Sequence, residues 1–159
     1  GGVPEGQIVQ AWHKASHVTQ AIRTGREVIN SYNRKIYLDY PANKTNAEEL
    51  EMHSRRYRNR LVSTKSIYSF NPIPKGLTPE EEDRIIGLEA PVWTEQIQLN
   101  RLDKKVFPRL LSVAETGWTS PKVKNWESFQ RRFVKHSQIL EALNIDYDRN
   151  DSIIETSEQ

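Results

Sequence analysis

Three short, mostly apolar runs with helix-forming stretches between and after them constrain the fold of this chain most. The runs have strand length and lie at residues 8–12, 27–31 and 85–93. Strands that are separated by helices pair in parallel through right-handed crossovers. We therefore predict an α/β chain with three parallel strands. Three strands are too few to close a barrel, and parallel sheets are normally covered on both faces, so the predicted architecture is incomplete.

Capping residues mark the ends of several predicted helices. Ser16 is a candidate N-cap for a helix that Gly25 ends, and Thr78 with Pro79 is typical of a helix start. Asn125 is a candidate N-cap for a final amphipathic helix. Residues 32–44 are predicted to be a loop. The helices themselves are predicted at 17–24, at 46–62, from 79, from about 108 to 118, and from 126 to about 143.

The last residues differ in composition from the rest. Beyond Tyr147 the chain is acidic and poor in apolar residues, which predicts a domain over 1–147 and a disordered tail over 148–159. The aromatic residues in the last two predicted helices are assigned to packing and expected to be largely buried. They are Trp118, Trp126, Phe129 and Phe133.

Composition and motifs exclude several classes of function. The chain has no cysteine, which rules out disulfides and thiolate metal sites, and 23 basic against 21 acidic residues give a net charge of only +2. No apolar run approaches the roughly 18 residues that span a bilayer, so no membrane partner is predicted. His13 and His17 stand four apart, but His13 directly follows a predicted strand and no glutamate lies between them. We predict neither a metal nor a cofactor.

Aromatic and acidic residues recur two positions apart near the ends of predicted strands. Tyr37 with Asp39 is one such pair, and Trp93 with Glu95 is the other. In extended backbone, residues two apart point the same way, so each pair sets a ring beside a carboxylate. Ring faces pack on the apolar side of a pyranose, and carboxylates accept hydrogen bonds from its hydroxyls. With Trp12 as a second wall, the pairs predict a sugar site at the carboxyl ends of the strands; the alternative is that these aromatics are core.

The order of five motifs resembles one known family. The motifs are VQAWH at 9–13, YLDY at 37–40, YSFNPIP at 68–74 leading into LTPE at 77–80, GLEAPVWTE at 87–95, and FPRL at 107–110 with AETGW at 114–118. Together they resemble the C-terminal part of the catalytic barrel of the family-20 glycoside hydrolases, the β-N-acetylhexosaminidases. The resemblance implies a partial (β/α)8 barrel that covers about strands six to eight with their helices.

The resemblance also implies roles for the site residues. Trp12 matches a tryptophan that lines the pocket of the terminal sugar, and Trp93 matches one that closes it. Tyr37 matches the tyrosine that holds the acetamido oxygen, while Asp39 and Glu95 match carboxylates that bind hydroxyls around O4 and O6. The implied mechanism is retaining and substrate-assisted: the acetamido carbonyl attacks the anomeric carbon and gives an oxazolinium intermediate. The implied partners are glycans that contain N-acetylhexosamine.

The sequence departs from the family pattern in several places. The adjacent Asp-Glu pair that supplies the acid and the orienting aspartate belongs to strand four of the family barrel, upstream of the segments matched here. The early-strand arginine and the strand-five tryptophan have no match either. Residues 41–86 contain no tryptophan for the loop after strand seven, so Tyr57, Tyr68 or Phe70 would have to replace it.

A whole barrel of this type needs about 250 residues. We therefore expect this chain to be a fragment that is inactive alone. Its exposed strand edges are expected to pair with the missing half of the barrel or with a second copy.

Two other functions stay open from the sequence. One is a non-catalytic sugar-binding module that uses Trp12, Tyr37 and Trp93. The other is a surface for nucleic acid or another polyanion, formed by the basic run from Arg55 to Arg60. The near-neutral net charge argues against the second, so no nucleic-acid partner is predicted.

Overall fold

A three-stranded parallel sheet organises the N-terminal part of the fold. The computed structural model describes residue 4 and residues 6–44 and 59–154. Its strands β1 (Val9–Ala11), β2 (Val28–Asn30) and β3 (Ile85–Leu88) are hydrogen-bonded in the order β1-β2-β3, and both pairings are parallel. This confirms the predicted α/β architecture. The third strand is shorter than expected, because the backbone leaves the sheet after Leu88.

Helix α1 (Ala15–Arg23) connects the first two strands and covers the sheet. It buries Val18 and Ile22 against Val28 of β2. Gly25 ends the helix as predicted: its φ is 80°, and its N–H donates to the Ile22 carbonyl. The prediction of Ser16 as N-cap was wrong. The helix begins at Ala15, directly after Lys14, and no side chain caps it.

Residues 32–44, predicted as a loop, contain the short helix α2 (Asn33–Ile36). The segment that follows is buried, and Leu38 packs in a core with Ile36 and Val113. Most of the helix predicted at 46–62 lies outside the described residues, and residues 59–63 are not helical. Helix α5 (Thr64–Tyr68) starts after Ser63, whose hydroxyl accepts a hydrogen bond from the Ser66 N–H.

The predicted caps of the later helices are confirmed. Thr78 and Glu81 form a reciprocal capping box on α6 (Pro79–Glu82). After β3, two short 3₁₀ turns, η1 (Thr94–Gln96) and η2 (Leu99–Arg101), lead into α7 (Leu102–Val106). Helix α8 (Arg109–Trp118) starts after Pro108, and α9 (Trp126–Ala142) is capped by Asn125, whose Oδ1 accepts from the Ser128 N–H at 2.8 Å.

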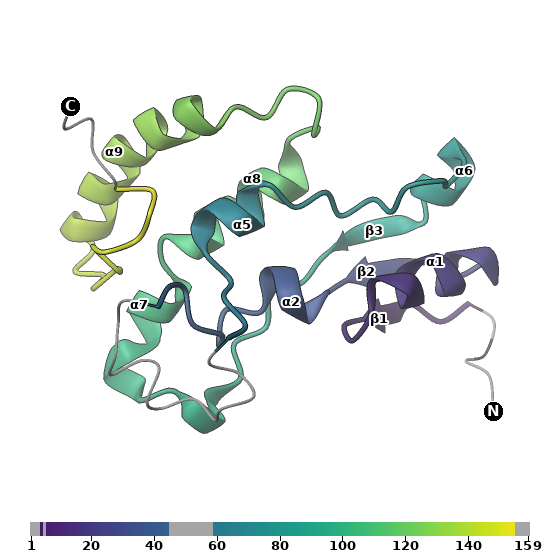
Figure 1. The fold of residues 1–159 in the computed structure, drawn as a ribbon, viewed down its shortest axis with the longest axis horizontal. Helices are drawn as coiled ribbons and strands as arrows, with labels where there is room; N and C mark the ends of the chain where they lie inside the picture. The colour runs from purple at the N-terminus through teal and green to yellow at the C-terminus, as the bar shows by residue number, and fades with distance from the viewer. Residues whose placement is uncertain (1–3, 5, 45–58, 155–159) are drawn as a thin grey trace.

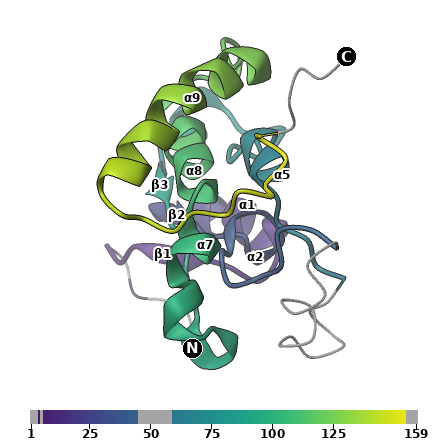
Figure 2. The same ribbon diagram turned by 90° about the vertical axis from the view of Figure 1, so that its left-hand side faces the viewer.

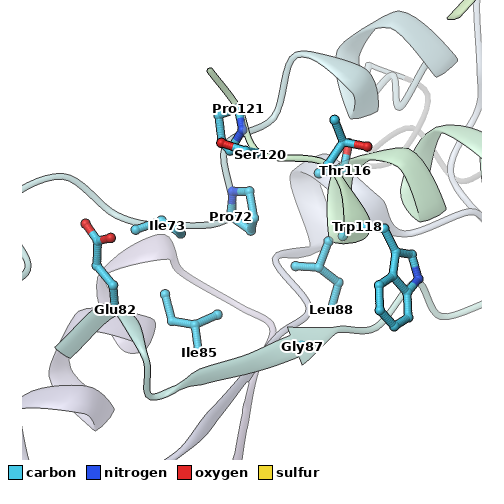
Figure 3. Close-up of a pocket in the computed structure, with 12 residues that line it drawn as sticks. Pro72, Ile73, Glu82, Ile85, Gly87, Leu88, Thr116, Trp118, Ser120 and Pro121 are labelled. Atoms are coloured by element: carbon cyan, nitrogen blue, oxygen red, sulfur yellow. The ribbon is translucent and has the colours of Figure 1, made fainter. Parts of the chain in front are cut away.

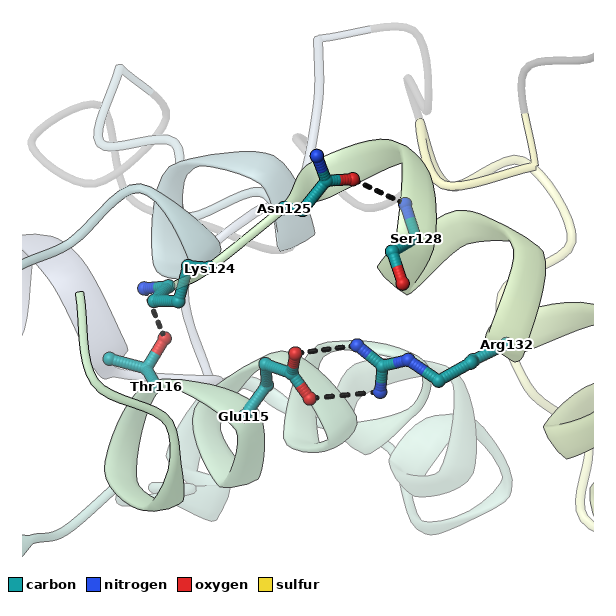
Figure 4. A network of polar contacts seen from close by, with 6 residues as sticks. All are labelled: Glu115, Thr116, Lys124, Asn125, Ser128 and Arg132. Atoms are coloured by element: carbon teal, nitrogen blue, oxygen red, sulfur yellow. Dashed lines mark hydrogen bonds and ion pairs between the residues drawn. The ribbon is translucent and has the colours of Figure 1, made fainter. Parts of the chain in front are cut away.

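Helices α8 and α9 are joined by polar contacts (Figure 4). Arg132 on α9 donates to both carboxylate oxygens of Glu115 on α8, at 3.0 and 2.6 Å. Lys124, in the connection between the helices, donates to the Thr116 hydroxyl at 3.2 Å and to the Phe70 carbonyl at 3.3 Å. This network holds the connection against both α8 and the chain after α5.

Figure 1 shows the order of the layers, with the sheet and α1 at one end, α5 and α8 in the middle, and α9 at the other end. In the view turned by 90°, α8 and α9 lie near each other, and the C-terminal segment passes from α9 back toward α5 (Figure 2). Among the described helices, none is long and apolar enough to cross a bilayer.

Packing of the C-terminal aromatics follows the prediction only in part. Phe129 and Phe133 are buried as expected, and Trp126 is half-buried against them. Trp118 is 92% exposed, so its predicted burial was wrong. It is the last residue of α8, and no described segment covers its ring.

The predicted disordered tail was wrong for residues 148–154. Ile153 is buried in the same core as Phe129 and Phe133. Asp151 is also buried, and it accepts a 2.6 Å hydrogen bond from the Thr64 hydroxyl. These two contacts attach the tail to α5 and α9 despite its acidic composition. Residues 155–159 lie outside the described residues.

Candidate functional site

The predicted site residues Tyr37 and Asp39 lie in the turn that follows α2. Tyr37 ends α2 in extended backbone, and Leu38 and Asp39 form the turn itself. The Leu38 N–H donates to the Pro91 carbonyl at 2.9 Å. This hydrogen bond holds the turn against the segment after β3, two residues before Trp93.

Tyr37 and Trp93 contact each other directly through their side chains. The Trp93 indole N–H, which can only donate, faces the Tyr37 hydroxyl. Burial raises the pKa of Tyr37, and the nearby Trp93 side chain opposes that effect. The charges of Asp39 and Glu89 raise the same pKa further, which places both carboxylates near the ring.

Asp39 is half-buried beside Tyr37. Burial raises the pKa of Asp39, while the nearby backbone N–H groups of Asp39 and Trp93, and the charges of Lys105 and Arg109, lower it. One carboxylate oxygen, Oδ1, is buried and accepts no hydrogen bond from any residue that the structure describes. A buried oxygen without a donor is unfavourable, so this atom is suited to accept from a ligand.

The structure brings Tyr37, Asp39 and Trp93 together, but by a different geometry from the one predicted. The spacing argument assumed extended backbone at both pairs. Asp39 instead lies in a turn, and Glu95 lies in the 3₁₀ turn η1, so neither pair shares the face of a strand. Glu95 is exposed, and the Trp93 ring is 55% exposed beside the buried Tyr37 hydroxyl.

Trp12 lies directly after β1, at the carboxyl end of the strand as predicted, and is 48% exposed. Its ring centroid is 5.1 Å from that of His13, and the His13 and His17 centroids are 6.1 Å apart. Within the described ranges, no hydrogen bond or ring contact joins Trp12 or Glu95 to Tyr37, and no group of three or more His, Asp or Glu residues gathers as a metal site would require.

Sequence analysis missed two cations that support the turn. Lys105 on α7 donates to the Asp39 carbonyl at 3.1 Å, and Arg109 on α8 donates to the Tyr40 carbonyl at 2.9 Å. Arg109 belongs to the FPRL motif, which identified its position but not its burial. Lys105 lies in no motif.

Most of the basic run from Arg55 to Arg60, the candidate polyanion surface, lies outside the described residues, which exclude 45–58. At the end of that basic run, Arg60 donates to the Tyr40 hydroxyl at 3.2 Å. A polyanion surface along this run stays an untested alternative.

A cavity of about 330 Å³ lies away from this cluster, between β3 and the end of α8 (Figure 3). Ile85 and Leu88 of β3 line it together with Pro72 and Ile73 from the preceding connection. Trp118 stands at its margin. None of the predicted site residues lines this cavity.

The glycosyl hydrolase family 20 catalytic domain matches residues 2–121. The chain belongs to glycosyl hydrolase family 20. A β-hexosaminidase of Akkermansia muciniphila is 30% identical over 150 residues, which cover 91% of this chain and 29% of that protein.

Solved structures agree with the family-20 assignment. The N-acetyl-β-hexosaminidase of Streptomyces plicatus, in complex with Thio-NAglucal, superposes with a TM-score of 0.74 at 30% identity over 92% of this chain and 30% of that one. A mutant of the Streptomyces plicatus β-hexosaminidase, in complex with product GlcNAc, superposes with a TM-score of 0.74 at 29% identity, with the same coverage of 92% and 30%. The family-20 chain thus spans less than a third of the length of these relatives.

Proposed function

We propose that this chain is the C-terminal part of a family-20 barrel, with β1, β2 and β3 as strands six, seven and eight. The proposal is supported by three parallel strands in sequence order and by relatives more than three times as long as the matched region. Residues 1–147 form the barrel portion. The whole enzyme removes terminal, non-reducing β-linked N-acetylglucosamine or N-acetylgalactosamine.

The observation that carries the proposal is the cluster of Tyr37, Asp39 and Trp93. It combines an exposed indole face, a tyrosine hydroxyl and a buried carboxylate oxygen that accepts no hydrogen bond from the described residues. The indole face packs on the apolar face of the sugar ring. Asp39 Oδ1 accepts a hydrogen bond from a sugar hydroxyl, and Glu95 and Trp12 extend the same pocket.

Tyr37 is the group of this chain closest to the chemistry. Because the donor-only indole N–H of Trp93 faces its oxygen, the hydrogen of Tyr37 is left to donate to the acetamido oxygen of the substrate. In substrate-assisted hydrolysis that oxygen attacks the anomeric carbon with retention of configuration, and a preorganised donor holds it in line. Burial raises the pKa of Tyr37, so the hydroxyl keeps its proton at neutral pH.

The acid that protonates the leaving group and the aspartate that orients the acetamide come from strand four in the family. No described residue near Tyr37 offers an adjacent Asp-Glu pair, so polypeptide outside this sequence supplies both. The chain alone binds the sugar and does not hydrolyse it.

The surface around β3 is suited to bind another polypeptide. The edge of β3 away from β2 has no strand partner among the described residues, and Ile86 and Trp118 are 45% and 92% exposed beside it. An unpaired, apolar strand edge favours association. The remainder of the barrel packs there, and self-association is the alternative that light scattering of the purified chain would reveal.

Hydrolysis of an aryl β-N-acetylglucosaminide tests the proposal. The chain alone is expected to release no aryl alcohol, and co-expression with the strand-one-to-five segment of a family-20 relative is expected to restore hydrolysis. Asp39→Ala should abolish the restored activity, whereas Asp146→Ala, an exposed carboxylate paired with Lys104, should leave it unchanged. Binding without restored hydrolysis would favour the non-catalytic sugar-binding module. Restored activity that tolerates Asp39→Ala would contradict the assigned site.

A further inference from the structure

Two buried cations hold three consecutive carbonyl groups of the turn that carries Tyr37 and Asp39. Lys105 donates to the Asp39 carbonyl at 3.1 Å. Arg109 donates to the Tyr40 carbonyl at 2.9 Å and also to the Leu38 carbonyl. The two residues stand four apart, and Arg109 donates to the Lys105 carbonyl as well, so they act from one side of the turn.

The same pair ties the turn to a second segment. Arg109 donates to the Val62 carbonyl at 3.0 Å, and the Val62 N–H donates to the Pro41 carbonyl at 2.9 Å. Lys105 is 4% exposed and Arg109 is 1% exposed. Burying a cation is costly unless acceptors replace its water, and here the acceptors include these backbone carbonyls. The geometry therefore fixes the backbone on both sides of Asp39.

We propose that Lys105 and Arg109 are positioning residues, which hold the 37–40 turn so that the Tyr37 hydroxyl and the Asp39 carboxylate face the sugar. The inference rests on the proposed sugar site. Neither cation contacts the sugar; both act through the backbone of the turn.

The pair also favours the charged form of Asp39. The charged and titratable groups that face this carboxylate are Lys105 from α7, Arg109 from α8 and Tyr37 from its own segment. The backbone N–H of Trp93, in the β3–η1 connection, also faces it. The two cations lower the pKa of Asp39 against the effect of burial. Removing either charge should therefore move the titration of Asp39 to higher pH.

Lys105→Met tests the inference, because methionine keeps the aliphatic volume and removes the charge and the donor. Lys104→Met is the matched control: Lys104 is the neighbouring residue, its side chain is 49% exposed, and it pairs with Asp146 at 3.1 Å. The first measurement is an NMR pH titration of the Asp39 side-chain carboxyl in the full chain without sugar. The second is the affinity for N-acetylglucosamine at pH 7.

We expect the Asp39 midpoint to rise in Lys105→Met and to stay at the wild-type value in Lys104→Met. Affinity should fall roughly tenfold in the first variant, the size expected for one lost charged hydrogen bond, and stay unchanged in the second. Lys105→Arg, which restores the charge, should return the midpoint toward the wild-type value. A purely structural role would lower thermal stability and leave the affinity for N-acetylglucosamine unchanged.

The Asp39 midpoint tests the action of Lys105 on the turn, and the affinity for N-acetylglucosamine tests the proposed sugar site. An unchanged Asp39 midpoint in Lys105→Met would overturn the electrostatic effect of Lys105 on Asp39, whether or not the sugar binds. The midpoint could also rise in Lys105→Met although the wild type binds no N-acetylglucosamine. That result would confirm that Lys105 acts on the turn and would contradict the proposed sugar site. A raised midpoint with unchanged affinity would overturn the link between the pair and sugar binding.

Discussion

The side chains of Tyr37 and Trp93 lie side by side although one residue follows α2 and the other follows β3. The Tyr37 ring is buried, whereas the Trp93 ring is 55% exposed. The pair therefore sets an exposed indole face beside a buried tyrosine. Under the proposed function, the sugar ring packs on that indole face and the Tyr37 hydroxyl holds the acetamido group.

Trp93→Phe should weaken sugar binding while the fold persists. Phenylalanine keeps a ring face but is smaller and removes the indole N–H that faces the Tyr37 hydroxyl, so the affinity for N-acetylglucosamine should fall roughly fivefold. Isothermal titration calorimetry measures this directly. Trp118→Phe, at a 92% exposed position outside the cluster, serves as the control and should bind like the wild type. Equal affinities in all three proteins would remove Trp93 from the site.

The ionisation of Asp39 should lower the stability of the fold at neutral pH. Burial raises the pKa of Asp39, so the folded chain binds this proton more tightly than the unfolded chain. The free energy of unfolding therefore falls as pH rises from the ordinary aspartate value of about 3.9 through the folded-state pKa. Asp39→Asn should unfold at a higher temperature than the wild type at pH 7, and the difference should shrink toward pH 3.9. A variant that is less stable than the wild type at pH 7 would contradict this account.

The tail should be attached by the contact between Thr64 and Asp151. Both residues are buried, and the hydroxyl donates to the carboxylate at 2.6 Å. Thr64→Val keeps the shape but leaves Asp151 Oδ2 without this donor, which should cost about 1–3 kcal/mol of unfolding free energy in urea. Thr24→Val, where an exposed hydroxyl donates to the Ala21 carbonyl, should cost less than about 0.5 kcal/mol. Similar losses at both positions would argue that the tail contact is dispensable.

The cap of α9 should contribute measurably to stability. Asn125→Ala removes the side chain that accepts from the Ser128 N–H and should lower the free energy of unfolding by about 1 kcal/mol. Ser16→Ala is the matched control, because Ser16 lies inside α1 and caps nothing. Chemical denaturation of both variants tests the difference, and a larger loss at Ser16 would show that the cap assignment is wrong.

Features that depend on residues close in the sequence could be predicted, and features that depend on distant residues could not. Strand positions and the caps at Thr78 and Asn125 were predicted, because apolar spacing and capping are local. The exposed Trp118 and the buried Asp151 were missed, because each depends on segments far along the chain. Sequence spacing grouped Tyr37 with Asp39 correctly but for the wrong reason, since a turn rather than a strand orients them.

The side chains that hold the 37–40 turn in place were the hardest feature to predict from the sequence. Lys105 and Arg109 bind backbone carbonyls, and such acceptors carry no side-chain signature in a sequence. A lysine and an arginine four apart in a helical stretch are ordinarily solvated, so their burial becomes visible only once the 37–40 turn is placed against α7 and α8.

The indole N–H signals of the four tryptophans test the central claim most directly, because each reports on one place in the fold. The chain would be labelled with ¹⁵N and titrated with N-acetylglucosamine, and the Asp39→Ala variant would be titrated in parallel. The account predicts that the Trp93 signal moves most, that Trp12 moves with it, and that Trp118 and Trp126 stay in place. These shifts should disappear in Asp39→Ala. Shifts confined to Trp118 or Trp126, or no shift at all in the wild type, would contradict a sugar site built on Tyr37, Asp39 and Trp93.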